Sequence, residues 1–417
     1  MQELSQYAVG IDIGTTTIRC VVGHIDSSTG TPTIVGVGSA PNSGMRKGVV
    51  ANLSGPAQAI DTALGEAERM SGYQVDSALL SINGSHILST KTDGMIAVGG
   101  VDHEIDEEDL VRLEEVATTG KVPANREILE VVPHSYRLDG QDNIKDPLGM
   151  TGTRLEIEAN VVSALVPHVN NLTKASEMAT VAPHGVVASV FAAARSVLTE
   201  QQLENGVAVV DIGGATTSVA VYEEGDLQHL AVIPYGGVTI TNDLAIGLKT
   251  DPELAEQVKL KHGVASSRSE SSRAAVKFQG ETYEFETKDI DEIIEARLEE
   301  ILEAVERELK KAGRSGKLPS GVVLTGGSAH IKGLADFAKE KLGLAARVGK
   351  PSGFGGVAEG VESPEFSTVV GLMLMDIQNG GRAMQQHKKA GSPAQPGKKA
   401  LKQASGVMSR IFDKFKA

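Results

Sequence analysis

Two aspartates, each followed by an isoleucine and a glycine, are the residues of this sequence best suited to bind a charged ligand. Asp12 lies in YAVGIDIGTTTIRCVVGHI, and Asp211 lies in the similar segment VAVVDIGGATTSVAVY. In each segment a glycine lets backbone N–H groups approach a phosphate, and nearby threonine hydroxyls add donors. The carboxylate at the strand end can hold Mg²⁺ through water, because Mg²⁺ gives up its hydration shell reluctantly.

One such segment alone would be an ordinary strand–turn–strand, but two copies facing each other would hold a triphosphate from both sides. We therefore predict a nucleotide site, with ATP and Mg²⁺ as ligands and with Asp12 and Asp211 binding the metal through water. The candidate nucleotide-binding residues are Asp12, Gly14, Thr15, Thr16 and Thr17 in the first segment, and Asp211, Gly213, Gly214, Thr216 and Thr217 in the second.

A third segment, GVVLTGGSAHIKGL at residues 321–334, is typical of a buried strand that ends in a glycine-rich turn and continues into a helix. A base or ribose can lie against paired glycines where a side chain would obstruct it. Gly326, Gly327 and Ser328 are therefore further candidate nucleotide-binding residues. The alternative is a tight strand-to-helix turn whose glycines serve packing alone.

The elements around these segments indicate a duplicated α/β domain. Val- and Ile-rich runs on both sides of each Asp-Ile-Gly predict β-hairpins. Helices are expected over residues 105–117, from Pro252 to Gly263, and over residues 289–312 after a polar stretch. The last of these has apolar residues at three- and four-residue steps, which predicts one buried face. Those residues are Ile290, Ile294, Leu298, Ile301, Val305 and Leu309.

Composition and charge exclude several classes of protein. The 417 residues favour two or more domains, and the single cysteine, Cys20, excludes an internal disulfide. The net charge is −14, although the segment from Asn379 onward holds nine lysines and arginines against one acid. An acidic body argues against nucleic-acid binding, whereas a basic tail favours anionic lipid or an acidic partner. With no secretion signal and no membrane-spanning run, a cytoplasmic protein is expected.

The C-terminal segment SGVMSRIFDKFKA predicts a short cationic amphipathic helix, residues 405–417, after a flexible linker over residues 379–404. One face would carry the apolar residues, and we expect that face to bind the membrane. The alternative is a helix that packs on this protein or on another one. The candidate membrane-binding residues are Val407, Met408, Ile411, Phe412 and Phe415.

The three glycine-rich segments, in this order, resemble the phosphate-1, phosphate-2 and adenosine motifs of the actin/Hsp70/sugar-kinase superfamily. LLSINGSHI at residues 79–87, the stretch at residues 128–156 and GGVTITNDLAIGL at residues 236–248 are similar to the FtsA family of bacterial cell-division proteins. The resemblance implies an α/β, actin-like (ribonuclease H-like) duplicated fold with four subdomains and an FtsA-type 1C insertion. It adds Gly236, Glu256 and Lys259 to the nucleotide-binding candidates, although Glu256 and Lys259 could equally be solvated helix charges.

The resemblance also implies where the subdomains begin and end. The predicted ranges are 1–83, 164–204 and 362–378 for subdomain 1A, 84–163 for 1C, 205–234 and 316–361 for 2A, and 235–315 for 2B, followed by the linker and the tail helix.

What the resemblance implies about function is an ATP-binding protein that forms actin-like filaments. It would tether the tubulin-like ring protein FtsZ to the cytoplasmic side of the cell membrane at the division septum, together with other divisome proteins. Arg297 would receive the acidic C-terminal peptide of FtsZ, or else pair with Glu300 on its own helix. The alternatives are a PilM-like pilus-assembly protein and a small-molecule kinase of the same superfamily.

Two departures from the family pattern predict slow or absent ATP hydrolysis. Thr17 stands where the family often has a lysine, so one charge contact to phosphate is missing there. Ser189 stands where well-hydrolysing relatives have a glutamine that positions the attacking water.

Overall fold

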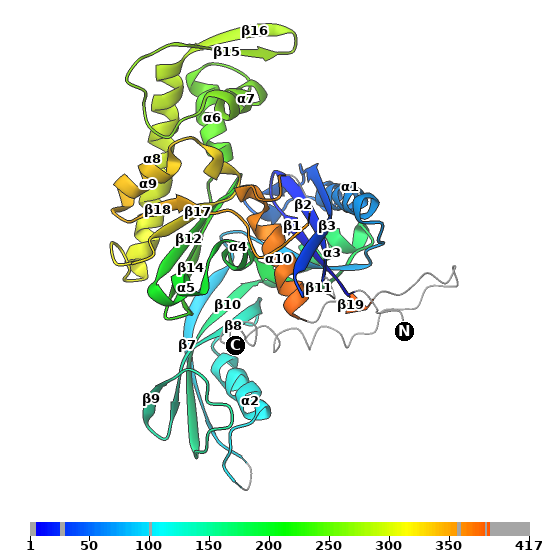
Figure 1. Cartoon of the computed structure of the whole chain (residues 1–417), viewed down its shortest axis with the longest axis vertical. Coiled ribbons are helices and arrows are strands. Elements are labelled where there is room, and N and C mark those ends of the chain that lie inside the picture. The colour runs from blue at the N-terminus through cyan, green and yellow to red at the C-terminus, as the bar shows by residue number, and fades with distance from the viewer. Residues whose placement is uncertain (1–5, 26–29, 100–101, 357–359, 380–381, 384–417) are drawn as a thin grey trace, which may run out of the picture.

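The computed structural model describes residues 6–25, 30–99, 102–356, 360–379 and 382–383, and these residues form two similar halves joined side by side (Figure 1). The first half contains a sheet in the order β11-β6-β1-β2-β3, and the short strand β19 (Arg382–Ala383) also pairs with β1. Its main strands are β1 (Gln6–Ile13), β2 (Thr17–Ile25), β3 (Pro32–Pro41), β6 (Ser77–Ile82) and β11 (Ala182–Ala188).

The second half repeats this sheet, in the order β14-β13-β12-β17-β18. In both sheets three consecutive strands pair antiparallel, and two later strands join in parallel beside the first. The predicted duplicated α/β fold is therefore confirmed. The strands of the second sheet are β12 (Val207–Ile212), β13 (Thr217–Glu223), β14 (Asp226–Ile233), β17 (Val322–Thr325) and β18 (Ala346–Val348).

The helices follow the same repeat. In the first half α1 (Ser54–Ser71) packs on β2 and β3, and in the second half α8 (Thr287–Lys311) packs on β13 and β14. The six apolar residues predicted for the buried face of α8 are all buried, as expected from their spacing. The other repeated helices are α3 (Val166–Met178) and α4 (Ser189–Val197) in the first half, and α9 (Leu334–Leu342) and α10 (Ser367–Gln378) in the second.

The two halves meet at helices α4 and α10, which pack on each other between the sheets (Figure 1). Their backbones approach so closely that a Cβ added at Gly371 would lie 1.7 Å from the carbonyl oxygen of Ala192. Helix α10 also packs on β1, and α4 packs on β12 and β13, so each helix contacts the sheet of the other half. One hydrophobic core consequently includes residues of both sheets.

The first half carries an insertion between β6 and α3. It is an antiparallel sheet in the order β7-β10-β8-β9, with α2 on one face and a hydrophobic core of its own. The predicted acidic helix is α2, which begins after an Asp106 capping box, and strands β7 and β8 of the insertion reach β14 of the second half. Its elements are β7 (Leu88–Ala97), α2 (Glu107–Thr118), β8 (Arg126–Leu138), β9 (Gln141–Ile144) and β10 (Arg154–Leu165).

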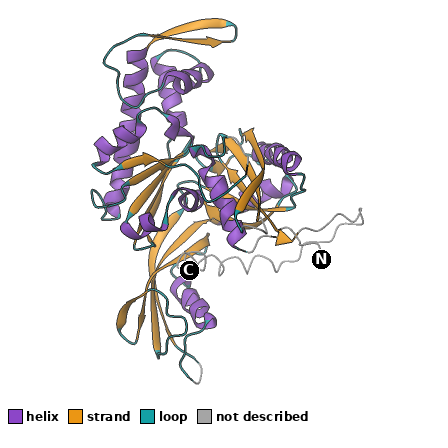
Figure 2. Cartoon of the chain, viewed as in Figure 1, coloured by secondary structure: helices purple, strands orange, loops and turns teal. Residues whose placement is uncertain are grey.

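The second half carries its insertion elsewhere, between β14 and β17. Helices α6 (Gly237–Gly247) and α7 (Pro252–His262) pack on the first part of α8, at the opposite end of the molecule from β9 (Figure 1). A hairpin of β15 (Arg273–Phe278) and β16 (Glu281–Glu286) lies above them, as Figure 2 shows. The sequence prediction was wrong here, because it expected only a polar segment and a helix that begins near Asp289.

Shorter elements complete the described chain. They are β4 (Met45–Arg46), β5 (Val49–Val50), α5 (Glu200–Asn205), η1 (Gly327–His330) and η2 (Pro364–Phe366). Within the described ranges, no helix combines the length and the apolar character that crossing a bilayer requires. The subdomain limits given above, as residue numbers, stay predictions.

Candidate functional site

A cavity of about 820 Å³ lies between the two halves, lined by the turns of both hairpins, by η1 and by parts of α6, α7 and η2. Segments far apart in the sequence therefore meet at one place. Of the predicted nucleotide-binding residues, those that line the cavity are Asp12, Gly14, Thr15, Thr16, Thr17, Asp211, Gly213, Gly214, Thr216, Glu256, Lys259, Gly326, Gly327 and Ser328.

The turn between β1 and β2 is held by contacts that require glycine. A Cβ at Gly14 would lie 2.4 Å from the carbonyl oxygen of Thr17, so no larger residue fits without a backbone shift. The side-chain amide of Asn42 donates to the carbonyl oxygen of Gly14 at 2.8 Å. The backbone N–H of Gly48 donates to Oγ1 of Thr15 at 3.0 Å. The segment after β3 thus fixes the shape of the first turn.

The turn between β12 and β13 is fixed from the other side of the cavity. The backbone N–H of Gly213 donates to the carbonyl oxygen of Thr216 at 2.9 Å, and the N–H of Gly237, at the start of α6, donates to the carbonyl oxygen of Gly213 at 2.9 Å. A Cβ at Gly214 would lie 2.7 Å from Cγ2 of Thr16. The two turns therefore lie close together, as a phosphate chain held between them would require.

Asp12 and Asp211 lie at the ends of equivalent strands, beneath the two turns. The hydroxyl of Ser81 donates to Oδ1 of Asp12 at 2.7 Å and accepts from the backbone N–H of Ile13 at 2.8 Å. Burial raises the pKa of both carboxyls, and that of Asp211 to about 7, with the charge of Asp12 adding to the effect on Asp211. Two neighbouring buried carboxyls favour a cation near them.

The donor set suits magnesium held through water. Among the residues that the structure describes, no three His, Cys, Asp or Glu side chains converge as a complete set of metal ligands. Mg²⁺ usually keeps several waters and takes one or two carboxylates together with substrate phosphates. Asp12 and Asp211 supply two carboxylates, and a phosphate bound at the two turns would supply the remaining protein-independent ligand of Mg²⁺.

The turn after β17 and helix α7 have features expected for binding a base and ribose. Gly326 has φ +84°, and a Cβ there would lie 2.3 Å from Oδ1 of Asp211, so the turn after β17 requires glycine. Ser328 donates through its hydroxyl to the carbonyl oxygen of Gly213 at 3.3 Å. Nζ of Lys259 lies 2.6 Å from a carboxylate oxygen of Glu256 and donates to the carbonyl oxygen of Gly237 at 3.0 Å. The Lys259 side chain is only 9% exposed, which is unlike a solvated helix charge.

Two predicted residues do not line the cavity. The side chain of Thr217 is buried, and its hydroxyl donates to the carbonyl oxygen of Tyr235 at 2.9 Å. Strand alternation explains this, because Thr216 and Thr217 point to opposite faces. Gly236 packs behind the second turn, where a Cβ would lie 2.5 Å from the carbonyl oxygen of Gly213. Gly237, the next residue, lines the cavity instead.

Asn83 is a lining residue that the sequence analysis missed. It follows β6 in the first half, yet its amide nitrogen donates to Oγ1 of Thr216 at 3.2 Å, and its amide oxygen accepts from the hydroxyl of Ser218 at 3.1 Å. It thereby connects the two halves across the floor of the cavity. Only its place directly after a predicted strand, in LLSINGSHI, could have suggested it.

Arg19 and Ser189 also line the cavity. Ser189 is the first residue of α4, so the position at which the resemblance expects a water-orienting glutamine does face the cavity. Arg19 is on β2, directly opposite Asp12 across the hairpin. The sequence analysis assigned no role to Arg19.

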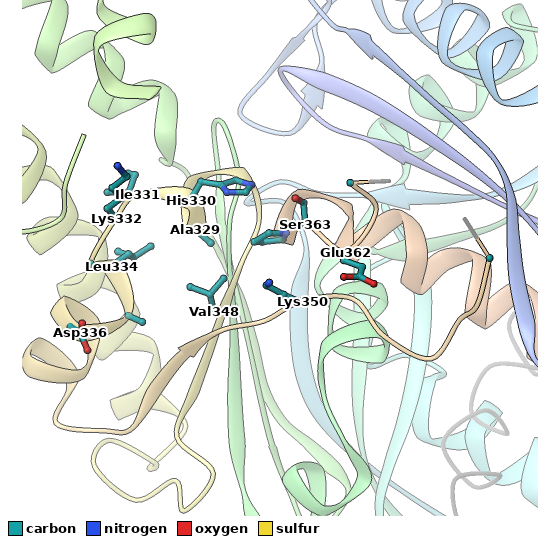
Figure 3. A pocket seen from close by; sticks show the side chains of 15 residues that line it. Ala329, His330, Ile331, Lys332, Leu334, Asp336, Val348, Lys350, Glu362 and Ser363 are labelled. Atoms are coloured by element: carbon teal, nitrogen blue, oxygen red, sulfur yellow. The ribbon is translucent and has the colours of Figure 1, made fainter. Parts of the chain in front are cut away.

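A second cavity of about 820 Å³ lies beside the first (Figure 3). In that view Leu334 and Asp336 lie on one side of it, and Lys350, Glu362 and Ser363 lie on the other. Of the three glycine-rich segments only the third lines it, through residues 329–334, and none of the predicted nucleotide-binding residues does. The predicted nucleotide-binding residues therefore single out the first cavity.

The remaining candidate residues lie away from the cavity or outside the described chain. Arg297, on α8, bonds to both carboxylate oxygens of Asp243 on α6, at 2.6 and 3.1 Å, and also pairs with Glu300. The pairing with Glu300 on the same helix is the alternative that the sequence left open. The predicted tail helix lies outside the described residues, together with Val407, Met408, Ile411, Phe412 and Phe415.

Comparison with known proteins gives a consistent result. The family described as "Cell division protein FtsA" matches residues 208–371, and the "SHS2 domain inserted in FTSA" matches residues 84–163. The "Cell division protein FtsA" of Pseudomonas aeruginosa is 34% identical over 374 residues, covering 89% of each chain. That of Bacillus subtilis is 36% identical over 375 residues, covering 89% of this chain and 83% of the relative.

Solved structures share the fold at lower identity. The PilM–PilN type IV pilus biogenesis complex has a chain with a TM-score of 0.65 and 20% identity, covering 89% of this chain and 98% of that one. MreB5 of Spiroplasma citri bound to ADP has a TM-score of 0.52 and 14% identity, covering 90% of this chain and 97% of that one. These likenesses support the actin-like fold.

Proposed function

The chain belongs to the FtsA family of cell-division proteins, and from that premise we propose that it binds ATP with magnesium in the cavity between its halves. The observation that carries the proposal is the meeting of three separate glycine-rich turns at one cavity. Each turn excludes side chains where a phosphate, a ribose or a base would lie. A solved protein of the same fold, MreB5 of Spiroplasma citri, is bound to ADP, which agrees with a nucleotide as the ligand.

In the proposed complex, the backbone N–H groups of the turns at Gly14 and Gly213 bind the phosphates. Asp12 and Asp211 hold Mg²⁺ through water, and the metal offsets the negative charge of the phosphate chain. The base and ribose lie near Gly326, with Lys259 and Glu256 at the edge of the base. Nothing in this arrangement requires the nucleotide to be hydrolysed.

We expect hydrolysis to be slow. Ser189 faces the cavity with a hydroxymethyl side chain, which is too short to hold a water in line with a phosphate held by the turns. The nucleotide would then act mainly as a ligand that holds the two halves together. ATP-bound subunits with closed halves would assemble into filaments, and the filament would present many C-terminal tails to the membrane.

The tail gives the proposed membrane attachment. One short tail helix binds lipid reversibly, since it buries few apolar side chains and must also fold on the surface. A filament binds more tightly, because the second and later tails attach at a high effective concentration. The same filament would tether FtsZ at the division septum on the cytoplasmic side of the membrane, and other divisome proteins would join it there.

Arg297 is the residue proposed to receive the C-terminal peptide of FtsZ. Its guanidinium is held by Asp243 and Glu300, so an acidic peptide would have to replace one of these carboxylates. Replacing Asp243 with asparagine should strengthen peptide binding, because it frees the guanidinium without removing it. Unchanged binding in both Asp243→Asn and Arg297→Ala would place the peptide elsewhere.

The alternatives are less well supported. The PilM likeness, at 20% identity, concerns the fold. A small-molecule kinase needs an acid or base beside a phosphoryl acceptor. The sequence segments near the cavity offer no side chain that clearly suits this role.

The decisive experiment is calorimetric titration of the full chain with ATP and magnesium, followed by sedimentation with ATP, FtsZ and anionic vesicles. We expect saturable binding, ATP-dependent pelleting and co-pelleting of FtsZ that needs its C-terminal peptide. Absence of any ATP binding would refute the proposal. Rapid ATP consumption that depends on a small acceptor would favour the kinase instead.

A further inference from the structure

The insertion of the first half is joined to the rest of the molecule through two stretches of chain, residues 83–87 and 163–166, which we call the junction. The first stretch follows β6, and the second spans the end of β10 and the start of α3. Arg126, at the start of β8, contacts both. Its guanidinium donates to the carbonyl oxygen of His86, and to Oγ and the carbonyl oxygen of Ser163 at 2.9 and 2.7 Å. One side chain of the insertion thus holds both of its attachments.

His86 connects Arg126 with the floor of the cavity. Its side chain is buried, its ring centroid lies 4.3 Å from that of His168, and its Nε2 lies 3.2 Å from the carbonyl oxygen of Asn83. Burial lowers the pKa of His86 to about 4, and His168 and Arg126 lower it further, so the ring is neutral at neutral pH. Because a carbonyl oxygen only accepts, Nε2 carries the proton of the ring and donates to Asn83. The backbone of Asn83 is therefore positioned by His86, and His86 by Arg126.

Asn83 in turn lies against the supports of both hairpin turns. A Cβ at Gly48 would lie 2.9 Å from the carbonyl oxygen of Asn83, and Gly48 donates through its N–H to Oγ1 of Thr15. On the other side, the Asn83 amide donates to Oγ1 of Thr216 at 3.2 Å. The Thr216 hydroxyl accepts this bond and keeps its own hydrogen to donate into the cavity that it lines. A phosphate oxygen that accepts this hydrogen would polarise the hydroxyl and strengthen its bond to Asn83.

We propose that Arg126 is a positioning residue that couples the insertion to the nucleotide cavity, so that a bound nucleotide and the attachment of the insertion strengthen each other. The inference rests on the proposed nucleotide function. Coupling between two sites is reciprocal, since both must favour the same state of the element between them. That element is the junction, which is either bonded as in this structure or locally opened. The competing explanation is that Arg126 and His86 only hold the shape of the junction, whether or not a nucleotide is bound.

The first test is calorimetric titration of the full chain and its variants with ATP and magnesium. Arg126→Met keeps an unbranched side chain and removes the donors. We expect ATP affinity to fall by about fivefold or more, which is the lower end of coupling between sites. Arg137→Met is the matched control, because Arg137 lies on the same strand and pairs with Asp142 and Glu156, both within the insertion. The ATP affinity of this control should equal that of the wild type.

Hydrogen exchange separates coupling from a role in shape alone, because it reports the local opening of single amides. The reporting amides are the junction N–H groups of Gly84, Ile87 and Val166, each of which is bonded in the structure. In the wild type, ATP should slow their exchange by about fivefold or more. In Arg126→Met, ATP should no longer slow exchange at Val166, which lies beyond Arg126 as seen from the cavity. Gly237, whose N–H bonds to the second turn, should still be protected by ATP.

A second pair of variants tests the connection through His86. His86→Gln keeps a side-chain N–H near the place of Nε2, whereas His86→Phe keeps a ring and loses the donor. We expect His86→Gln to bind ATP about as tightly as the wild type, and His86→Phe to lose about as much affinity as Arg126→Met. If Arg126→Met does not fold, Arg126→Lys replaces it. A lysine lacks the planar fork that reaches both stretches of the junction, so a several-fold loss of ATP affinity is expected there too.

Three results would overturn the inference and leave the proposed function in place. They are wild-type ATP affinity in a folded Arg126 variant, ATP protection of Val166 that persists in that variant, and equal losses in His86→Gln and His86→Phe. A wild type that binds ATP without slower exchange of the junction amides would overturn it as well. A wild type that binds no ATP would instead refute the proposed function, and the coupling with it.

Discussion

The two Asp-Ile-Gly hairpins have the same strand register, but the residue paired with the aspartate is charged in one hairpin and uncharged in the other. Arg19 lies opposite Asp12 in the first, whereas Ser218 lies opposite Asp211 in the second. Ser218 is uncharged, and its hydroxyl donates to the amide oxygen of Asn83, which comes from the first half. The two copies therefore share the glycine turn, but the side chains beside it differ. One hairpin carries positive charge, and the other is bonded to the opposite half.

The two halves also carry different insertions, and a residue of the first insertion gives the largest change in stability that we expect. Glu130, in β8 of the first insertion, is buried with its Oε1 unpaired among the described residues, and burial raises its pKa to about 8, helped by Glu114. Because the folded pKa is raised, ionisation opposes folding. The penalty is absent below about pH 4.5 and complete above about pH 8, reaching up to ~5 kcal/mol.

Glu130→Gln should therefore stabilise the protein at pH 8.5 and change it little near pH 5. Urea unfolding across this range measures the effect, with Glu158→Gln, exposed on β10, as the control. If the free energy of unfolding of Glu130→Gln depends on pH as that of the wild type does, the Glu130 carboxyl does not destabilise the first insertion.

The two turns differ in tightness, which gives the next effect. A Cβ at Gly14 would lie 2.4 Å from a backbone oxygen, whereas a Cβ at Gly213 would lie 3.2 Å from one. Gly14→Ala should lower the free energy of unfolding by about 2 kcal/mol, and Gly213→Ala by less than about 1 kcal/mol. Denaturant unfolding of the ligand-free proteins compares them. Equal losses of unfolding free energy in the two variants would mean that both turns exclude a side chain to the same degree.

The bond between the halves should have a smaller effect. Asn83→Ala removes the contacts to Thr216 and Ser218 and should destabilise by about 1–2 kcal/mol. Combined with Ser218→Ala, the loss should be less than additive by ~0.5–1 kcal/mol. Asn42→Ala is the matched control, since it bonds within the first half and should add to Ser218→Ala independently. If the losses of unfolding free energy in Asn83→Ala and Ser218→Ala are strictly additive, the two side chains do not interact across the halves.

The smallest effect concerns turnover. Ser189→Gln would place an amide at the start of α4, where it can orient a water, and should raise steady-state ATP turnover by about tenfold, or ~1.4 kcal/mol. A phosphate-release assay measures this. A rate that stays at the wild-type level would mean that water positioning is not what limits hydrolysis.

Local patterns were enough to predict the repeated hairpins, the glycine turns and the buried face of α8. Each depends on neighbouring residues, such as the apolar run that ends at Asp12 or at Asp211. The hairpin of β15 and β16 was missed because each strand has only six residues, and β16, ETYEFE, holds three glutamates and is mostly exposed. Asn83 could not be assigned either. It lies at the site because of a contact across the halves, to Thr216 and Ser218, which a linear motif does not record.

The close approach of α4 and α10 limits how the molecule can change shape. The backbones of the two helices touch at Gly371, which leaves little room for one helix to slide along the other. If the proposed nucleotide closes the two halves, we therefore expect that closure to be a tilt around Gly371. A tilt moves each point in proportion to its distance from the pivot. The β15–β16 hairpin and the β9 end of the first insertion lie farthest from it (Figure 1). A small change of angle at the ligand thus becomes the longest travel at the two tips of the protein.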